Sequence, residues 1–585
     1  MKNDYIVKQV YRSFLIVMLL SAIASILGSL IDNVIVGRYF GGDALAAMGI
    51  VAPIILLFLT MGTLCAGGGS ILASQAMGRG DADGVRNIFS VAMWFGIAGG
   101  LVVCLLGLMF TDPLAALLGA EDSLRELSVS YLQGYMVGAI PIILLSSLMT
   151  FVQIDGSQNL PIIATAAMTL SDILLDILVA VVFHGGMFGM AMASSISYFI
   201  AAGVLCLHFR KKNHILKLIR PRAFGRTFGR MAVTSTPVVI TCLGELIRVA
   251  VLNNMLVTIA VAAVAAMNVR SQAQNIVGAT ATGGAQALGP MAGMFFGEED
   301  RTTLGQSLKS ALKQGMILNV AAALILAAVP GVFPRLLGVT DAETAAMANT
   351  AIRCFAISLP IRFVNLLLTQ YYQTTKHTGF AVTLSVLQIL AYPLAAAALL
   401  IRPMGPSGVW LSFPIAEVLT LVTALVYILF KSRNGSLLDR VLMLPEDFGG
   451  SADNKLSVSI GNSMDEVMDM AHSVYTFGEE RGVAREMMDK VSLCIEEMAG
   501  NVVQHSFKPG EKRWLDLFVY VKPETILLRM RDNGRPFDPL ARLREQAESD
   551  PEKNLGLKVI NGITDTFEYR NGVSLNICVM TLRRS

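Results

Sequence analysis

The stretch SFLIVMLLSAIASILGSLIDNVI (13–35) is predominantly apolar from end to end. A helix needs about 20 mostly apolar residues to cross the hydrocarbon core of a bilayer, so this stretch predicts a membrane span. Eleven further runs of this kind follow it. The twelve predicted spans lie near 13–35, 45–69, 88–110, 129–152, 160–183, 187–208, 229–254, 260–290, 310–333, 346–372, 380–401 and 407–430.

The composition agrees with a membrane protein. The 585 residues are 54% hydrophobic and 15% charged, with a mean hydropathy of +0.60. These values exclude a disordered chain and a purely soluble enzyme. Residues 1–432 carry a net charge of +7, whereas 433–585 carry −4 in a much more polar stretch. We therefore expect a membrane region followed by a soluble domain, and no nucleic-acid partner, because the soluble part is slightly acidic.

Basic residues between the sixth and seventh spans predict the orientation. The segment from His208 to Arg230 contains eight Lys or Arg residues and no acid. Loops rich in Lys and Arg stay on the cytoplasmic side. Because the number of predicted spans is even, both termini and the soluble domain are expected in the cytoplasm, with the spans in the cell (inner) membrane.

The two halves of the membrane region repeat each other in one gapless register. In this register Gly78 matches Gly297, and Leu117-Leu118-Gly119 matches Leu336-Leu337-Gly338. Six plus six spans in one orientation predict two helical bundles related by an axis along the membrane normal, which suits alternating access. The predicted domains are 1–212 and 213–432 for the two bundles, 433–454 for a linker and 455–585 for the soluble domain.

Three acidic residues fall inside spans of the first half. Asp32 lies in the first span, and Asp172 and Asp176 lie on one helical face of the fifth. Carboxylates at this depth are costly and are functional candidates by default. Crowded acids repel one another and favour proton uptake, whereas the oxygens of Asn33 and Ser194 would also suit Na⁺. For Asp32 alone, an alternative to cation binding is a structural role in which it caps the end of its helix near water.

Charges in the second half allow two interpretations. Glu245 and Arg248 lie about one helical turn apart on a predicted helix, so they either neutralise each other or take part in transport. The same two interpretations, mutual neutralisation or a part in transport, apply to Arg270, Arg362 and Glu417.

The membrane region resembles the multidrug and toxic compound extrusion (MATE) transporters. The resemblance rests on IDNVIVGRYFGGDALAAMGIVAPI (31–54), SQAMGRGDADGVRN (74–87) and SDILLDILVAVVFHGGMFGMAMASSIS (171–197). It implies efflux of a small organic cation in exchange for H⁺ or Na⁺. By this match Asp32 and Asp176 are cation-site acids and Ser194 is the sixth-span hydroxyl. Asp172 stands where many members have Asn, and Glu245 resembles a second-half acid of some members.

The soluble domain reads as an α/β fold. Strand patterns at 455–461, 513–521, 525–531, 566–570 and 573–583 are combined with helical patterns at 463–482 and 484–506 and a short helix near 555–564. The economical layout is one mixed sheet with helices on one face, an α/β sandwich.

Polar residues on the second of these helices form a possible nucleotide site. Glu497, Asn501 and His505 recur at every fourth position beside the apolar stripe. The neutral oxygen of Asn501 suits Mg²⁺ beside phosphate ligands, and Glu497 could deprotonate a hydroxyl group or water.

Two glycine-containing segments complete this candidate site. Asp532 ends a predicted strand and could accept a hydrogen bond from an adenine amino group, while Gly534 allows close approach of the base. Asn554, Gly556 and Leu557 open a helix whose first N–H groups suit phosphates.

These segments resemble the GHKL ATPases, most closely the anti-sigma factor serine kinases. The matching motifs are EEMAGNVVQH (496–505), DNGRPFD (532–538) and NLGLKVI (554–560). The resemblance implies a Bergerat-like fold that binds ATP and Mg²⁺, with Glu497 as base, Asn501 as Mg²⁺ ligand and Asp532 as adenine reader. It also implies a small regulatory protein, phosphorylated on Ser, as partner. Asn554 departs from the Gly that is common there.

The sequence thus predicts a secondary transporter of organic cations with a cytoplasmic ATP-binding, kinase-like domain. One alternative is a membrane-tethered signalling kinase whose spans act as a receptor. Another is a flippase for lipid-linked precursors, although those usually have a more cationic cavity. ATP-driven pumping is disfavoured because the chain has no G-x-x-x-x-G-K-[ST] motif.

Overall fold

The computed structural model describes residues 5–211, 214–431, 435–450, 452–507, 513–546 and 555–584. The chain forms two compact units. One consists of Tyr11–Leu444 and is helical. The other consists of Pro445–Ser585 together with Met1–Val10, and it contains the sheet.

The helical unit begins with the elements of the first half. They are α1 (Tyr5–Tyr39), α2 (Gly42–Arg79), α3 (Ala82–Met109), α4 (Thr111–Leu117), α5 (Asp122–Val137), α6 (Ala139–Ile154), α7 (Leu160–Ile177), the π-helical turn η1 (Leu178–Phe183), α8 (Gly186–Cys206) and the 3-10 turn η2 (Leu207–Arg210).

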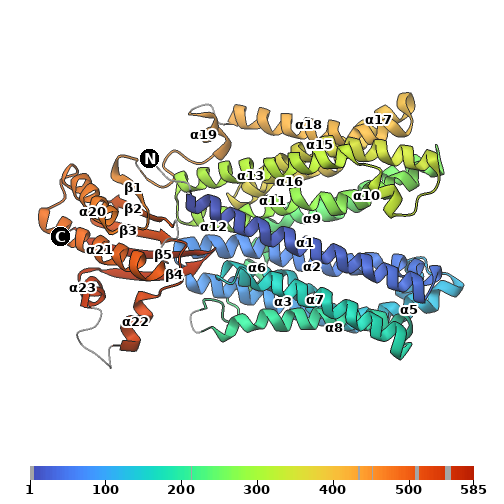
Figure 1. The fold of residues 1–585 in the computed structure, drawn as a ribbon, viewed down its shortest axis with the longest axis horizontal. Helices are drawn as coiled ribbons and strands as arrows, with labels where there is room; N and C mark the ends of the chain where they lie inside the picture. The colour runs from blue at the N-terminus through green and yellow to red at the C-terminus, as the bar shows by residue number, and fades with distance from the viewer. Residues whose placement is uncertain are drawn as a thin grey trace. The chain divides into compact units, whose positions relative to one another are not determined.

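The elements of the second half follow in the same order (Figure 1). They are α9 (Phe224–Val257), α10 (Val261–Val277), α11 (Ala279–Gln286), α12 (Leu288–Gly297), α13 (Arg301–Ala328), α14 (Val332–Leu336), α15 (Ala342–Thr374), α16 (Thr378–Val386), the π-helical turn η3 (Leu387–Ala391), α17 (Tyr392–Met404), α18 (Pro406–Lys431) and α19 (Leu437–Leu442).

The helix boundaries reproduce the predicted repeat. The offset that takes Gly78 to Gly297 also takes both ends of α3 onto those of α13, and the first residue of α1 onto that of α9. Even the caps correspond. Asp81 Oδ1 accepts from the Gly84 N–H at 2.7 Å before α3, and Asp300 Oδ1 accepts from the Thr303 N–H at 3.0 Å before α13. The duplication is therefore present in the structure as well as in the sequence.

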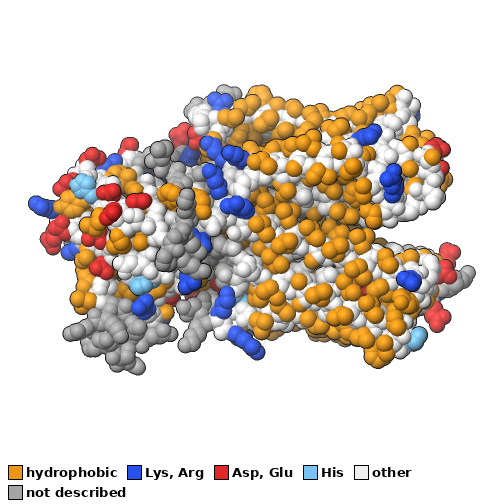
Figure 2. Space-filling view, viewed as in Figure 1, with side chains coloured by type: hydrophobic (Ala, Val, Ile, Leu, Met, Phe, Trp, Pro, Cys, Tyr) orange, Lys and Arg blue, Asp and Glu red, His pale blue; other side chains and the backbone are white. Residues whose placement is uncertain are grey.

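Ten described helices are long and apolar enough to cross a membrane, and α5 with α6, which meet at 49°, would form an eleventh. Figure 2 shows hydrophobic side chains over much of the helical unit's surface. The predicted eighth span, 260–290, is instead divided among α10, α11 and α12. Pro290 has no N–H to donate to Gln286, so the helical ladder is interrupted near Ala287. Twelve spans result only if these three helices count as one broken span.

Part of the predicted linker, 433–454, is helical. Ser436 and Asp439 form a capping box at the start of α19, which lies in the helical unit. The hydroxyl groups of Tyr371 and Tyr372 on α15 donate to the Leu442 and Val441 carbonyl oxygens at 2.9 and 2.8 Å. These bonds fix α19 against α15.

The second unit is a five-stranded sheet covered by helices. Its elements are the 3-10 turn η4 (Ala452–Asn454), β1 (Lys455–Ile460), α20 (Met464–Glu479), α21 (Arg485–Asn501), the π-helical turn η5 (Val502–Ser506), β2 (Leu515–Val521), β3 (Thr525–Asp532), α22 (Pro539–Gln546), α23 (Leu555–Ile563), β4 (Thr566–Gly572) and β5 (Leu575–Arg583).

The strand order is β1-β2-β3-β5-β4, and every neighbouring pair is antiparallel. The prediction of a mixed sheet is therefore wrong. The reason is that β5 returns by a hairpin from β4 and inserts beside β3, so each neighbour runs opposite to the next. Apolar side chains of α20, α21 and α23 and of the strands share one core, which includes Val474, Ile495, Ile560 and Met530. The predicted sandwich is thus present.

Candidate functional sites

An acidic cluster lies in the first half, where α1 contacts α7. The two helices approach at Gly28 and Thr169, whose hydroxyl group donates to the Ala24 carbonyl oxygen at 3.3 Å. Farther along α1 and α7, Asp32, Asp172 and Asp176 interact electrostatically with one another. The structure thus brings together the three acids that the sequence predicts as a cation site.

Several carboxylate oxygens of this acidic cluster have no hydrogen-bond partner. Asp32 Oδ1, Asp172 Oδ1 and both carboxylate oxygens of Asp176 are buried without a donor from any other residue, and Asp32 and Asp176 lie close enough to share a proton. The Asp176 side chain is 1% exposed. Buried acceptors without donors are costly, and a bound proton or cation removes that cost. The acidic cluster therefore has the chemistry of a cation-binding site.

Hydroxyl groups surround the acidic cluster. Asp172 interacts with the hydroxyl groups of Ser194 and Ser197 on α8, as expected for Ser194. Tyr131 on α5 and Tyr198 on α8 also interact electrostatically with the acids. Sequence reasoning did not select either tyrosine, because one aromatic residue in an apolar helix gives no sign of a polar neighbour.

A second polar cluster lies in the second half. Arg248 donates to the Glu245 carboxylate within α9, and Gln274 Nε2 on α10 donates to Glu245 Oε1 at 3.0 Å. Glu245 and Arg248 therefore form an ion pair, and a role in transport, the other interpretation of these residues, stays a prediction. Arg248 is 1% exposed, so this pair is largely removed from water on the arginine side.

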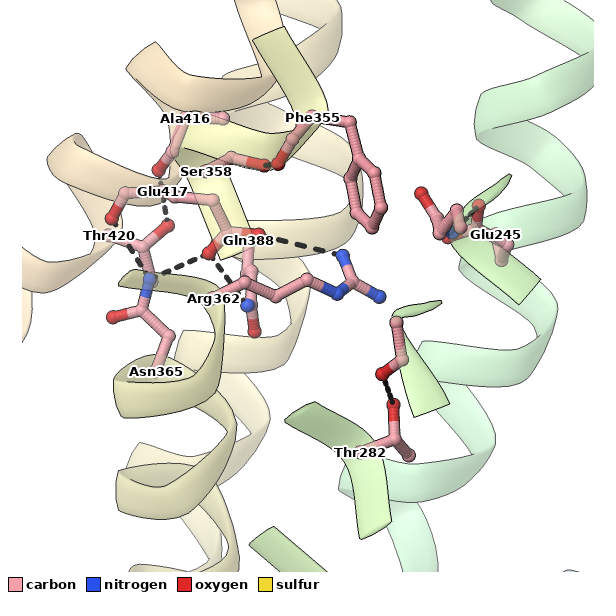
Figure 3. A network of polar contacts seen from close by, with 12 residues as sticks. Glu245, Thr282, Phe355, Ser358, Arg362, Asn365, Gln388, Ala416, Glu417 and Thr420 are labelled. Carbon is pink, nitrogen blue, oxygen red and sulfur yellow. Dashed lines mark hydrogen bonds and ion pairs between the residues drawn. The ribbon is translucent and has the colours of Figure 1, made fainter. Parts of the chain in front are cut away.

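Glu417 on α18 is the other acid of this cluster. Its Oε2 accepts from Asn365 Nδ2 and from Gln388 Nε2, both at 2.8 Å, and Arg362 Nη1 lies 3.5 Å from Oε1. Figure 3 shows the Arg362 guanidinium group between Glu417, to which a dashed line joins it, and the side on which Glu245 lies. Arg362 therefore connects the two acids electrostatically.

The soluble domain positions its candidate site at the end of α21. A Cβ atom added to Gly556 on α23 would lie 1.9 Å from Glu497 Oε2, so the Glu497 carboxylate rests directly on the backbone of α23. Asn501 is the last residue of α21, and the exposed His505 follows in η5, 5.8 Å from the Phe537 ring between centroids. The structure thus places Glu497 beside the predicted phosphate-binding helix.

Asp532 ends β3 at the base of this site and is 4% exposed. Its Oδ1 accepts from the Gly534 N–H and from Asn576 Nδ2, both at 2.8 Å. Burial raises the pKa of Asp532 to about 6, although these hydrogen bonds and Arg513 oppose the shift. Gly534 packs closely against the backbone of η5. An added Cβ atom would lie 2.7 Å from the Ser506 carbonyl oxygen, so only glycine fits here without a shift.

A small cavity borders Asp532. Its lining includes Met498, Phe537, Tyr569 and Asn576, and its volume is about 10 Å³, which is room for about one water molecule. An adenine ring is much larger, so side chains here must move to admit it. Leu557 is 2% exposed and belongs to the hydrophobic core beneath the site. The predicted residue Asn554 lies outside the described residues.

These features define a class of protein: a helical membrane protein of two repeats with buried charges, joined to an α/β domain with a five-stranded antiparallel sheet. The model of the MatE family matches residues 8–178 and 237–396, more than half of the chain. The chain therefore belongs to the MatE family. A histidine kinase-like ATPase domain matches residues 462–582, which implies ATP binding by the second unit.

Two relatives illustrate the similarity. The probable multidrug resistance protein YoeA of Bacillus subtilis (strain 168) is 29% identical over 216 residues, which are 36% of this chain and 46% of YoeA. The multidrug export protein MepA of Staphylococcus aureus (strain bovine RF122 / ET3-1) is 26% identical over 212 residues, 36% of this chain and 47% of MepA. The chain thus spans about half the length of the curated relatives it matches.

Solved structures share the fold. The outward-facing conformation of a multidrug resistance MATE family transporter of the MOP superfamily has a TM-score of 0.67 at 18% identity, covering 72% of this chain and 95% of that one. The Vibrio cholerae MATE transporter VcmN in the bent form has a TM-score of 0.66 at 18% identity, with the same two coverages.

Proposed function

We propose that the chain exports small organic cations in exchange for H⁺ or Na⁺ that binds at Asp32, Asp172 and Asp176. The observation that carries this proposal is the set of buried carboxylate oxygens without donors in the acidic cluster. A monovalent cation or a proton satisfies them when bound and leaves them costly when released. Ser194 and Ser197 add neutral oxygens of the kind that Na⁺ accepts.

Two further observations support export of organic cations. YoeA and MepA, which match 36% of the chain, are described as a multidrug resistance protein and a multidrug export protein. The excess of acid in the first half also favours positively charged substrates over negative ones.

The eight Lys and Arg residues between His208 and Arg230 support a cytoplasmic position for this connection. Because the number of predicted spans is even, both termini and the ATPase domain then also face the cytoplasm, and the helices lie in the inner membrane of the cell. In that compartment the domain meets ATP.

For the ATPase domain we propose binding of ATP with Mg²⁺, with Asn501 as a Mg²⁺ ligand and Glu497 as general base. The domain transfers phosphate to a serine of a small regulatory protein. The position of Glu497 against the Gly556 backbone supports this assignment, because a base must lie near the phosphates that the first N–H groups of α23 would hold.

Flux of a cationic dye into vesicles tests the transport proposal. The full-length protein is reconstituted, and H⁺ and Na⁺ gradients are imposed separately, each with and without ATP and Mg²⁺ on the domain side. We expect gradient-driven flux that Asp32→Asn with Asp176→Asn abolishes and that Asp43→Asn, an exposed residue at the start of α2, leaves intact. Unchanged flux in the double variant would contradict the proposed cation site, and dye binding without flux would favour a tethered receptor.

Binding of ATP to the full-length protein tests the nucleotide site. Magnesium should tighten ATP binding in the wild type and in Glu486→Ala, an exposed position on α21, but not in Asn501→Ala. Glu497→Gln should retain ATP binding and lose phosphate transfer. If Asn501→Ala bound ATP with Mg²⁺ as tightly as the wild type, the Mg²⁺ role would be wrong.

A further inference from the structure

A cavity of about 310 Å³ lies beside the polar cluster of the second half. Met18 and Ala22 of α1 line it on one side, while Gln274, Asn275 and Arg362 line it from α10 and α15. The cavity therefore lies between a helix of the first half and helices of the second. Its volume is at the lower end of the range for small-molecule sites, about 300–1,000 Å³.

The charged side chains of the polar cluster, of which Arg362 lines the cavity, do not balance. Three arginines, Arg248, Arg270 and Arg362, face two acids, Glu245 and Glu417. Glu245 is engaged by Arg248 and Gln274, and Glu417 already accepts from two amides besides its contact with Arg362. One positive charge therefore remains in excess among these five side chains.

Arg270 carries this excess. Its side chain is 1% exposed, and its Nε and Nη1 atoms have no hydrogen-bond partner. The guanidinium carbon lies 3.6 Å from the centroid of the Phe413 ring and 5.2 Å from that of Phe355. These cation–π contacts hold the group without neutralising its charge. Arg270 lies one helical turn before Gln274, which lines the cavity.

Arg362 faces the cavity itself. Only its Nη1 atom forms an ion pair, at 3.5 Å from Glu417 Oε1, and its buried Nε atom has no partner. A guanidinium group has five N–H donors in a planar fork that matches a carboxylate or a phosphate. Arg362 thus has donors that Glu417 does not use, and its side chain lines the cavity.

We propose that this cavity binds an anionic group of an organic substrate, a carboxylate or a phosphate, through Arg362, with Arg270 supplying the positive charge that balances it. This deepens the proposed export function, because it makes zwitterions that carry an amine and an acid the preferred substrates. If the arginines only balanced the two glutamates, three guanidinium groups and their unpartnered donors would not be needed.

The test compares norfloxacin, a fluorescent zwitterion with one carboxylate, with its ethyl ester, which lacks that charge. Both are bound to the purified full-length protein without any gradient, and fluorescence anisotropy gives the Kd. We expect the acid to bind at least about tenfold more tightly than the ester, a difference of about 1.4 kcal/mol. Equal binding of acid and ester by the wild type would overturn the proposal.

The decisive variant is Arg362→Gln combined with Glu417→Gln, which removes one charge of each sign. Its affinity for the acid should fall to that for the ester, while the affinity for the ester stays constant. Arg402→Gln, at an exposed position on α17, should keep the tenfold preference. If the double variant melts far below the wild type, Arg362→Lys decides instead, and a preference for the acid that stays at tenfold in Arg362→Lys would overturn the proposal.

Competition with short-chain phosphatidylglycerol distinguishes the two sources of the anion. Displacement of norfloxacin from the wild type, lost in the Arg362 variants, would place a lipid phosphate in the cavity. Failure to displace norfloxacin would assign the cavity to a soluble carboxylate. The norfloxacin binding measurements use no gradient and are therefore independent of the dye-flux assay. Loss of dye flux would refute the export function without contradicting the anion site.

Discussion

Gly78 of α2 and Gly297 of α12 pack against each other's helix in a reciprocal contact. A Cβ atom added to Gly78 would lie 2.1 Å from the Met294 carbonyl oxygen, and one added to Gly297 would lie 2.2 Å from that of Gln75. Gln75 and Met294 are themselves equivalent positions of the two repeats, separated by the same offset as Gly78 and Gly297. The contact of Gly78 with Met294 thus repeats as the contact of Gly297 with Gln75, with the two repeats exchanged. Such a reciprocal contact is expected at an axis that relates the repeats.

Alanine at either glycine should destabilise the protein by about 1–3 kcal/mol, because the new methyl group overlaps a backbone atom that cannot easily move. Thermal melting of the detergent-solubilised protein measures this. Gly203→Ala on α8 is the matched control, since nothing lies within 4 Å of an added Cβ atom there. A melting temperature for Gly78→Ala equal to that of Gly203→Ala would show that α2 and α12 do not pack this closely.

The sequence predicted the membrane spans and the two repeats, because hydropathy and internal duplication can be recognised directly in the order of the residues. The offset that aligns Gly78 with Gly297 also aligns the bounds of α3 and α13. Hydropathy did not predict the division of the run 260–290, because the apolar character of the run does not show whether Pro290 bends a helix or ends it. Whether a membrane helix breaks there depends on whether neighbouring helices supply hydrogen-bond partners for the backbone groups that the break leaves free.

Gly556 provides a prediction for the ATPase domain. Gly556→Ala should abolish ATP binding or weaken it by at least about tenfold, because its methyl group would overlap the Glu497 carboxylate and displace the start of α23. Gly562→Ala, on the same helix with nothing within 4 Å of the added atom, should bind ATP normally. Isothermal titration with ATP measures both, and normal binding by Gly556→Ala would mean that the two helices separate in the nucleotide-bound state.

Asp532 predicts a pH dependence of nucleotide binding. Its pKa is raised by burial to about 6, so the carboxylate that would accept from an adenine amino group is present above pH 6 and protonated below it. Between pH 7.5 and pH 5.5 the ATP affinity should fall by about fourfold from this group alone. Asp532→Asn should bind weakly at both pH values. An equally large fall in the Asn variant would assign the pH dependence to another group.

The candidate sites were predictable only as far as residue type reveals environment. Asp32, Asp172 and Asp176 were found because an acid in an apolar run is conspicuous, and the structure brings them together. Leu557 was selected from a motif, but its side chain is in the core. The unpartnered state of Arg270 could not be predicted, because it depends on which of two acids each arginine reaches in three dimensions.

A buried network around Asp155 predicts a large effect on stability. Asp155 Oδ2 lies 2.8 Å from His208 Nε2, and the Asp155 carboxylate also accepts from the Ile215 and Leu216 N–H groups at 3.1–3.2 Å. Both side chains are almost fully buried, at 1% and 0% exposure. Asp155→Ala leaves these donors unpaired and should cost about 3–5 kcal/mol.

Asp112→Ala is the matched control for Asp155→Ala. Asp112 forms an ion pair with Arg125 at 2.5 Å, but the two side chains are 58% and 47% exposed, so water replaces the lost contact. Urea or thermal unfolding of the solubilised protein should therefore show a large loss for Asp155→Ala and almost none for Asp112→Ala. Similar losses for the two variants would mean that burial does not set the contribution of the Asp155 network.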